Sequence, residues 1–320
     1  MNILVLSCGS RNKIIHYFKR ELKSVGMVMA TDCSRLAPAL YDADKYFIVP
    51  SIGEESYLET ILTICTENRV NAVFSLIDPE LSLLARHKDE FLSVGTVPII
   101  SDYDTVEMCF DKYLLHNFLI KEGYKTAKTY ISKEVFYRDL EKGRISFPVF
   151  LKPRKGSASL NISVANEVEE LETIFKRHDD LLIQEYMHGT EYGADVYIDM
   201  ISRKPVSIFI KEKIKMRAGE TDKSVSIKDK SLFDLISDFV TKAKLVGVVD
   251  IDIFKIDNEY YISEVNPRFG GGYPHAYECG VNFPKMIINN IKNIVNSADM
   301  GSYDEGVYMM KYNEVKIVRG

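Results

Sequence analysis

Along the first third of the chain, hydrophobic positions follow two patterns in turn. Residues 2–8 open with an apolar run, which is typical of a buried strand, and residues 12–22 carry apolar side chains at the three- and four-residue spacing of a helix. Further strand-like runs and one more helical pattern follow, at 26–34, 45–51, 57–70 (helical), 71–81 and 97–101. Strands that alternate with helices predict a parallel, doubly wound sheet over about residues 1–105.

Beyond residue 105 the alternation is no longer strict. Helical spacing returns in four separate segments, residues 105–124, 167–177, 231–247 and 284–295. Strand-like segments lie between and after them, at 147–166, 181–199, 204–218 and 248–267. The last is predicted to be a hairpin that turns at Asp257-Asn258. Separate hairpins and helices indicate an α+β arrangement, so the predicted fold class is α/β plus α+β.

Composition and charge exclude several classes of protein. The 320 residues carry a net charge of -5 and no long basic block, which argues against nucleic-acid binding. The five cysteines form no CxxC pair, so we expect neither a zinc site nor a disulfide framework. The N-terminal apolar run is too short for a signal peptide, and no segment approaches the roughly 20 apolar residues of a membrane span. We therefore expect a cytoplasmic protein.

Acidic and amide side chains gather on the predicted C-terminal hairpin. Asp250 and Asp252 point to one side of their strand because side chains alternate with a period of two, and Glu264 and Asn266 share a face of the partner strand. Asp252, Glu264 and Asn266 can thus meet as three oxygen ligands, the donors that Mg²⁺ prefers. The alternative is a solvated face of the hairpin. The apolar neighbours and Pro267 favour a buried, constrained strand end.

A lysine and a loop of small residues form a second motif. Lys152 ends an apolar strand, where a buried ammonium is costly unless it meets an anion. Residues 156–159 then offer backbone N–H groups that can surround phosphate oxygens. The GxxxxGK[ST] pattern is absent, so a P-loop NTPase is disfavoured. A hairpin tip with solvated lysines is the alternative.

Two weaker signals concern a nucleotide and a substrate. Gln184, Glu185 and Tyr186 end a strand and precede Glu191, so a hinge could meet an adenine edge while a carboxylate accepts ribose hydroxyls. In the first domain, three charged residues lie where loops leave strand ends, the usual ligand crevice of open α/β sheets: Arg11, Asp78 and Glu80. They are either substrate contacts or solvated loop charges. The single Gly9 after the first strand is a weak indication of a dinucleotide site.

Taken in order along the chain, these motifs resemble the ATP-grasp superfamily. The series runs from Lys112 through Lys152 and its small-residue loop to the Gln184–Tyr186 hinge, and it closes with the acid-bearing hairpin and the E-x-N-P-R sequence of residues 264–268. The chain is most similar to the branch that contains the carbamoyl-phosphate-synthase large subunit, biotin carboxylase and many carboxylate–amine ligases. The resemblance implies a domain before the grasp domain at 1–105 and an ATP-grasp domain at 106–320. The latter would comprise a lid over about 120–183 and an antiparallel-sheet core over about 184–320.

The resemblance assigns nucleotide contacts to this sequence. ATP phosphates would meet Lys112, Lys152 and the mobile lid loop with Gly156, Ser157 and Ser159. Adenine would meet Gln184, Glu185 and Tyr186, and the ribose would meet Glu191. Lys211 and Arg217 lie in a region that often supplies a further phosphate contact.

It also assigns the metal and the chemistry. Asp252, Glu264 and Asn266 would bind Mg²⁺ or Mn²⁺, and Arg268 would lie beside the γ-phosphate as a catalytic residue together with Lys152. Substrate contacts are expected from the first domain, from Arg217, and from the segment after Arg268. In that segment Gly270 to Gly272 would let the backbone run close to the acceptor, with Gly271, Tyr273 and His275 near the substrate.

The implied activity is an ATP-dependent carboxylate–amine ligase that works through an acyl phosphate. The alternatives are phosphorylation of bicarbonate or carbamate, as in carbamoyl phosphate synthesis, and a non-catalytic ATP-binding protein. We expect one grasp domain and a C-terminal region too short for a biotin carboxylase. The expected partners are a small carboxylate and an amine, without nucleic acid or membrane, and a homodimer through the first domain is a hypothesis by analogy.

Overall fold

A parallel sheet forms the first part of the chain, as the alternating pattern predicts. The computed structural model describes residues 1–23, 25–156, 162–178 and 180–318. The strands are β1 (Asn2–Leu6), β2 (Met27–Asp32), β3 (Lys45–Ile48), β4 (Val70–Ser75) and β5 (Val97–Pro98). They pair in the order β3-β2-β1-β4-β5, all parallel. The helices are α1 (Asn12–Leu22), the 3₁₀ helix η1 (Pro38–Asp42), α2 (Tyr57–Glu67), α3 (Asp78–Arg86) and α4 (Lys88–Ser93).

Strand β1 is apolar throughout because both of its faces are covered. Ile3 and Val5 belong to one core, which continues into the rest of the molecule through Phe269, Tyr273 and Phe283. Leu4 and Leu6 belong to a second core beneath α2 and α4. The strand's period of two thus assigns alternate residues to different cores. One of these cores joins the first domain to the domain that follows.

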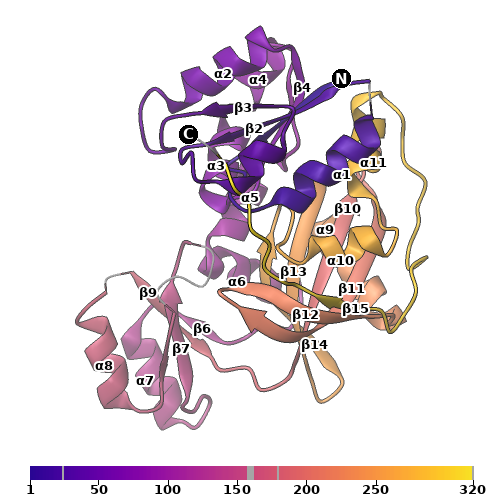
Figure 1. Ribbon diagram of the computed structural model, residues 1–320. Coiled ribbons are helices and arrows are strands. Elements are labelled where there is room, and N and C mark those ends of the chain that lie inside the picture. Colours follow the sequence, from indigo (N-terminus) through magenta and orange to yellow (C-terminus); the bar gives the residue numbers. More distant parts are fainter. Residues whose placement is uncertain (24, 157–161, 179, 319–320) are drawn as a thin grey trace.

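Two helices and a small lid follow. Helices α5 (Tyr103–Phe110) and α6 (Lys112–Lys121) lead into the lid, whose elements are β6 (Thr129–Tyr130), α7 (Lys133–Glu141), β7 (Val149–Pro153), β8 (Ser163–Ala165), α8 (Val168–Phe175) and β9 (Leu181–Glu185). The lid strands pair in the order β6-β9-β7-β8 around a separate apolar core that includes Phe136 and Leu151. In Figure 1 the lid projects at the lower left, away from the first domain.

An antiparallel sheet of six strands makes up the rest of the molecule. Its elements are β10 (Thr190–Ile198), β11 (Pro205–Arg217), β12 (Glu220–Ile227), α9 (Lys230–Lys242), β13 (Gly247–Ile256), β14 (Glu259–Asn266), α10 (Tyr273–Glu278), α11 (Phe283–Ile291) and β15 (Tyr308–Met310). The strand order is β14-β13-β10-β11-β12-β15. The predicted hairpin is β13–β14, and Asp257 and Asn258 at its tip both have positive φ (50° and 65°), as a two-residue type I′ turn requires.

The two faces of this sheet differ in chemistry. One face is apolar and packs under α9 and α6, with Ala194, Ile210 and Ile251 in contact with Ile236 and Phe239. Alternate residues point to the opposite face, which is lined with charged and polar side chains: Glu191, Asp195, Lys211, Lys213, Ser224, Ser226, Asp250, Asp252, Glu264 and Asn266. This polar face is where the predicted metal ligands lie.

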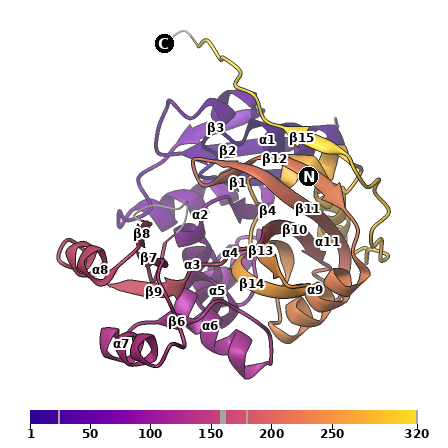
Figure 2. The same ribbon diagram turned by 90° about the horizontal axis from the view of Figure 1, so that it is seen from below.

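The parts of the molecule are tied together at two further places. The boundary predicted at residue 105 falls within α5, which packs both on α3 of the first domain and on α6, so the exact limit stays a prediction. The C-terminal segment runs from β15 back to the first domain (Figure 2), where Lys316 pairs with Asp42. None of the helices in the described ranges has the length and apolar character to cross a membrane.

Candidate active site

The predicted metal ligands are brought together by the register of the β13–β14 hairpin. Asp252 lies opposite Glu264, and Asp250 lies opposite Asn266. Opposed residues of an antiparallel pair point to the same face with Cβ atoms about 5 Å apart. Asp252, Glu264 and Asn266 therefore form one patch on the polar face. The geometry agrees with the sequence prediction of three clustered oxygen donors.

A lysine that the sequence analysis did not single out connects this patch to Glu191. The Nζ atom of Lys213 is 2.5 Å from Oδ1 of Asp252 and 2.8 Å from Oε1 of Glu191, and its side chain is only 4% exposed. Burial opposes the charge, but the two carboxylates outweigh it and raise the pKa of Lys213. The strand carries Lys211, Lys213 and Lys215 at a spacing of two, so the alternation could have shown that these lysines share one face.

Lys152 approaches the same patch from the lid. It ends β7, it is buried, and burial lowers its pKa to about 8 against the opposing charge of Glu264. Lys112 lies near enough to lower that pKa further, and its own Nζ donates a 2.7 Å hydrogen bond to the carbonyl of Gly156. A small cavity between Lys112, Gly156, Glu264, Asn266 and Asp78 marks the meeting of lid, sheet and first domain. The predicted loop contacts Ser157 and Ser159 lie outside the described residues.

The predicted adenine hinge joins the lid to the sheet. The Gln184 side chain is buried and donates to Oγ1 of Thr129 at 2.9 Å, and the residue pairs with both β6 and β7, so it serves the lid sheet. Glu185 accepts a hydrogen bond from the backbone N–H of Lys128. Tyr186 stacks on Phe150 with ring centroids 4.7 Å apart. The hinge therefore offers an aromatic surface and backbone groups next to the lid.

Arg268 is held by the first domain. Its Nε and Nη2 atoms each lie 2.9 Å from the carboxylate of Asp78, which begins α3. Both side chains are about nine-tenths buried, and although burial opposes the charge, Asp78 raises the pKa of Arg268. Asp78 is thus a positioning residue for Arg268. Glu80 was predicted to contact the substrate, and the structure places it elsewhere. It is fully buried and accepts hydrogen bonds from Tyr57 and Ser75, so it does not reach a substrate.

Arg11 reaches across to the six-stranded sheet. Its Nη2 lies 2.7 Å from Oε1 of Glu220, and Nζ of Lys311 lies 2.7 Å from the other oxygen of the same carboxylate. Burial lowers the pKa of Arg11, and Glu220 opposes that change. Arg217 is directed elsewhere: half exposed at the tip of β11, it pairs with Asp222. Of the two predicted basic substrate contacts, Arg11 alone lies near the site.

The three glycines after Arg268 are needed for close approach. Gly270 to Gly272 have no positive φ, so any residue could adopt their backbone angles. A Cβ on Gly270 would lie 2.4 Å from the Asp250 carboxylate, and one on Gly271 would lie 2.6 Å from Nη1 of Arg11. On Gly272 it would lie 2.7 Å from Cε of Lys211. The segment therefore lies directly on charged side chains of the polar face.

Tyr273 and His275, which we predicted to line the substrate, belong to the core instead. The Tyr273 hydroxyl donates to the carbonyl of Val281 and accepts from the N–H of Phe283. The Nε2–H of His275 donates to the carbonyl of Val307, and its Nδ1 accepts from Ser224. Burial lowers the pKa of His275 to about 4, so the ring is neutral and both nitrogens are satisfied by the fold.

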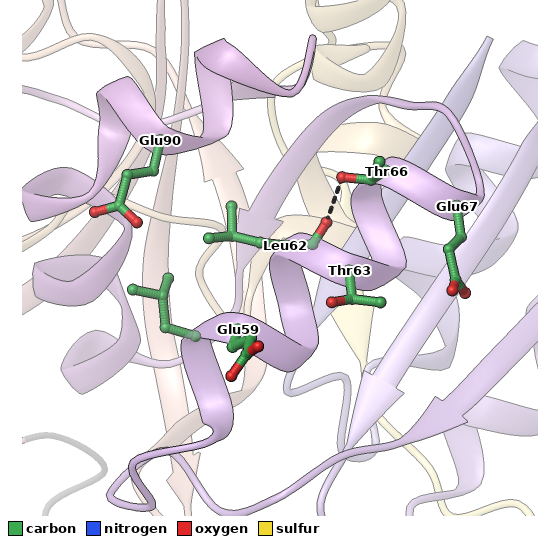
Figure 3. A pocket seen from close by; sticks show the side chains of 7 residues that line it. Glu59, Leu62, Thr63, Thr66, Glu67 and Glu90 are labelled. Atoms are coloured by element: carbon green, nitrogen blue, oxygen red, sulfur yellow. Dashed lines mark hydrogen bonds between the residues drawn. The ribbon is translucent and has the colours of Figure 1, made fainter.

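A second hollow lies away from these residues. Figure 3 shows it between α2 and α4 of the first domain, where Glu59, Glu67 and Glu90 surround an open surface with Leu62 and Thr63. It contains no basic side chain and none of the predicted site residues. An anionic nucleotide does not suit three carboxylates, so this hollow takes no part in the candidate site.

The residues of the patch fit a divalent cation with phosphates. Within residues 1–23, 25–156, 162–178 and 180–318, no three His, Cys, Asp or Glu side chains are arranged to hold a metal. Asp252 and Glu264 face each other across the hairpin, and the amide oxygen of Asn266 on the same face would be the third oxygen donor beside them. Hard oxygen donors with few protein ligands suit Mg²⁺ that shares its coordination with phosphates. Lys152 and Lys112 stand beside the patch as cations for the same phosphates.

Comparison with known proteins agrees with this arrangement. The family model described as a PylC-like N-terminal domain matches residues 3–100, and the model of the ATP-grasp domain matches residues 109–272. A carbamoyl-phosphate synthase from Methanobrevibacter smithii is 26% identical over 301 residues, which cover 89% of this chain and 79% of that protein. A D-alanine–D-alanine ligase from Campylobacter jejuni is 25% identical over 182 residues. This chain spans 51% of the length of that ligase.

Solved structures show the same fold. N5-carboxyaminoimidazole ribonucleotide synthetase from Thermotoga maritima superposes with a TM-score of 0.70 at 17% identity, covering 93% of this chain and 78% of that one. The biotin carboxylase domain of the 2-oxoglutarate carboxylase from Hydrogenobacter thermophilus gives 0.74 at 17% identity, covering 96% and 73%. The predicted fold class, a parallel-sheet domain followed by a grasp domain with an antiparallel core, is confirmed. Because the ATP-grasp model matches just over half of its residues, the chain belongs to the ATP-grasp family of ADP-forming ligases.

Proposed function

We propose that this enzyme is an ATP-dependent carboxylate–amine ligase that works through an acyl phosphate. The observation that carries the proposal is the convergence of Lys152, Lys112 and the Asp252–Glu264–Asn266 patch at the junction of lid and sheet, with Arg268 held beside them. Cations and oxygen ligands at one place suit the transfer of a phosphoryl group to a bound carboxylate. The family relationship supports the same class of reaction.

In the first step, a carboxylate oxygen of the substrate attacks the γ-phosphorus of ATP and ADP leaves. Lys152 and Lys112 offset the negative charge on the phosphates, and Arg268 faces the transferred group. Magnesium, when bound by Asp252, Glu264 and Asn266, supplies further positive charge to the phosphates. Lys213 now holds Asp252 and Glu191, so these carboxylates would have to release its ammonium to bind metal and ribose, and a nucleotide phosphate would be its new partner.

In the second step, an amine nitrogen attacks the carbonyl carbon of the acyl phosphate. Phosphate leaves and the nitrogen loses a proton, which gives an amide. Because an acyl phosphate reacts readily with water, the lid must close over the site before transfer. The bond between Lys112 and the Gly156 carbonyl is a contact from α6 to the lid loop that can help to hold that closure.

Phosphorylation of bicarbonate or carbamate is the second candidate. The similarity to a carbamoyl-phosphate synthase extends over 89% of the chain, and this extent favours keeping the candidate. The two functions differ in the group that accepts the phosphate. Bicarbonate dependence of ADP release, in the absence of organic acids, would support the second one.

The test measures ADP release and hydroxamate formation. Purified protein with ATP and Mg²⁺ is supplied with sets of carboxylates and hydroxylamine, which traps acyl phosphates as hydroxamates. We expect ADP and hydroxamate to form together with at least one carboxylate. Glu264→Gln should lower this rate at least about 100-fold, because it removes a charge aimed at the phosphate region.

A matched control lies on the same strand. Glu259 at the start of β14 is half exposed and pairs with Lys125, away from the patch, so Glu259→Gln should retain the wild-type rate. If no carboxylate in the set yields both ADP and hydroxamate, the ligase proposal is wrong. Release of ADP with bicarbonate alone would transfer support to the second candidate.

A further inference from the structure

The polar face of the six-stranded sheet is organised in rows that cross the strands. Glu191 lies opposite Phe254, Gly193 opposite Asp252, and Asp195 opposite Asp250. Successive rows are two residues apart, which is about 6.6 Å along a strand. The first row carries Glu191, the predicted ribose contact, and the second carries the predicted metal ligands Asp252 and Glu264. The third row carries Asp250 opposite Asn266, and the glycine segment that follows Arg268 lies against it.

Three cations near this third row already have carboxylate partners. Lys211 lies 2.5 Å from Asp195, Arg268 binds Asp78 at 2.9 Å, and Arg11 lies 2.7 Å from Glu220. Each pair has good geometry and is at least partly buried. Their charges are therefore largely compensated within the protein.

Asp250 differs from these carboxylates. It makes no hydrogen bond or ion pair within the described part of the chain, and burial and the nearby Asp252 raise its pKa to about 7 against the opposing charges of Lys211 and Arg268. Its side chain is partly exposed, so solvent or a ligand can reach it. Burying part of a carboxylate without a partner costs free energy that a matching cation would recover.

The glycine segment keeps this carboxylate accessible. Because a Cβ on Gly270 would lie 2.4 Å from Asp250, any larger residue would displace the carboxylate or cover it. Gly271 lies beside Arg11 in the same way. The segment thus forms a thin wall between the third row and the first domain, at the place where the reacting groups must meet.

We propose that Asp250 binds the ammonium group of the amine substrate. The proposal rests on the ligase function proposed above and adds to it a residue and a ligand chemistry: a primary amine that arrives in its protonated form. Its nitrogen gives up one proton to solvent before it attacks the acyl phosphate and a second as the amide forms. A neutral or anionic nucleophile would leave the Asp250 carboxylate without a partner. Asp250 lies one row beyond Asp252 and Glu264 and directly opposite Asn266, so an amine held there would border the predicted metal ligands, where the phosphorylated carboxylate would lie.

The test is a competition in the hydroxamate assay. Hydroxylamine is uncharged at neutral pH and traps the acyl phosphate, whereas an amine that occupies the acceptor position suppresses the hydroxamate by reacting or by blocking. The probes are ethanolamine, glycinamide, L-alanine, L-lysine, D-glucosamine and ammonium chloride. For each, the half-inhibiting concentration is measured relative to each variant's own uninhibited rate.

We expect at least one of these amines to suppress the hydroxamate in the wild-type enzyme. Asp250→Asn, which keeps the shape and removes the charge, should raise its half-inhibiting concentration about 10- to 100-fold, as expected for a lost charge-assisted bond. The control is Asp257→Asn at the exposed hairpin tip, where Asn also tolerates positive φ, and it should leave the value unchanged.

Each other outcome overturns the proposal in a distinct way. Equal half-inhibiting concentrations in wild type and Asp250→Asn, or no suppression by any probe, would show that the third row does not bind an ammonium group. Loss of hydroxamate formation in Asp250→Asn, or a shift in the Mg²⁺ requirement, would assign Asp250 to the metal site instead. Absence of hydroxamate in the wild type with every carboxylate would overturn the ligase function, and with it this proposal.

Discussion

The two faces of the six-stranded sheet are built by the same strands but obey different requirements. On β13, Ile251 and Ile253 point to the helices, and Asp250 and Asp252 point to the polar face. The apolar face is fully buried, and what it needs is volume and shape. On the polar face, the position of each charged group and the partner that it binds decide whether the side chain is available to a ligand. A shift of one residue in register would exchange the two faces, so the fold and the site depend on one alignment.

This difference also separates the consequences of mutation. A change on the apolar face removes packing, and its cost appears in the free energy of unfolding. A change on the polar face removes a charge from a paired set, and its cost appears in the reaction while the fold persists. The variants below test whether the two effects are as separate as the structure indicates.

The largest effect is expected at the link between Arg268 and Asp78. Lysine cannot make the two parallel bonds that the guanidinium makes, so Arg268→Lys should lower the rate of ADP release about 100-fold or more. Asp78→Asn should cost less, roughly 10-fold, because the arginine remains but is held less firmly. Steady-state kinetics, with a carboxylate that yields hydroxamate in the assay of the proposed function, would measure both rates. A rate in Arg268→Lys within twofold of the wild type would refute the assignment.

The second effect is on stability. Ile251 has no exposed surface and lies between Asp250 and Asp252 in sequence. Ile251→Ala should lower the free energy of unfolding by about 3 kcal/mol through lost contacts and a cavity, measured by urea denaturation. Its rate of ADP release at a temperature where it stays folded should equal that of the wild type. A large fall in the rate without a fall in stability would mean that the faces are coupled.

The smallest effect is expected on the pH dependence of the free energy of unfolding. It involves His275, which is polar but belongs to the core. Its folded-state pKa is about 4, whereas the unfolded value stays near 6.5, so the unfolded chain binds more protons between these values. The contribution that neutral His275 makes to the free energy of unfolding is therefore complete above pH 6.5, and it is lost as the pH falls toward 4. Between pH 7 and pH 5 the wild type should therefore lose roughly 2 kcal/mol more stability than His275→Gln. Parallel losses in both proteins would show that His275 is not held neutral.

Sequence reasoning succeeded where local geometry decides the outcome. The alternation of side chains placed Asp252, Glu264 and Asn266 on one face, and the Asp257-Asn258 turn fixed the length of the hairpin between them. These features depend on residues close together in the chain. Lys152 could be singled out because a lysine that ends an apolar strand is unusual.

Sequence reasoning failed where packing between distant segments decides which way a side chain points. His275 and Tyr273 follow the functional loop directly, but the face of α10 that reaches the core is set by contacts with Ser224, Val281 and Val307. Glu80 stands two residues after Asp78, yet the turn of α3 directs one outward to Arg268 and the other inward to Tyr57. No periodicity of the sequence shows which loop charge faces which way.

The bond between Asp78 and Arg268 has a consequence for how the molecule matures. The guanidinium follows β14 of the last part of the sheet, while its carboxylate partner belongs to a helix made 190 residues earlier in the chain. The arginine is held in this orientation where the first domain packs on the following domain through a shared apolar core. A partly synthesised or misdocked chain would thus hold a phosphate-binding surface without a correctly aimed arginine. Under the proposed function, turnover of ATP would therefore depend on the docking of the two parts as well as on the residues of the site itself.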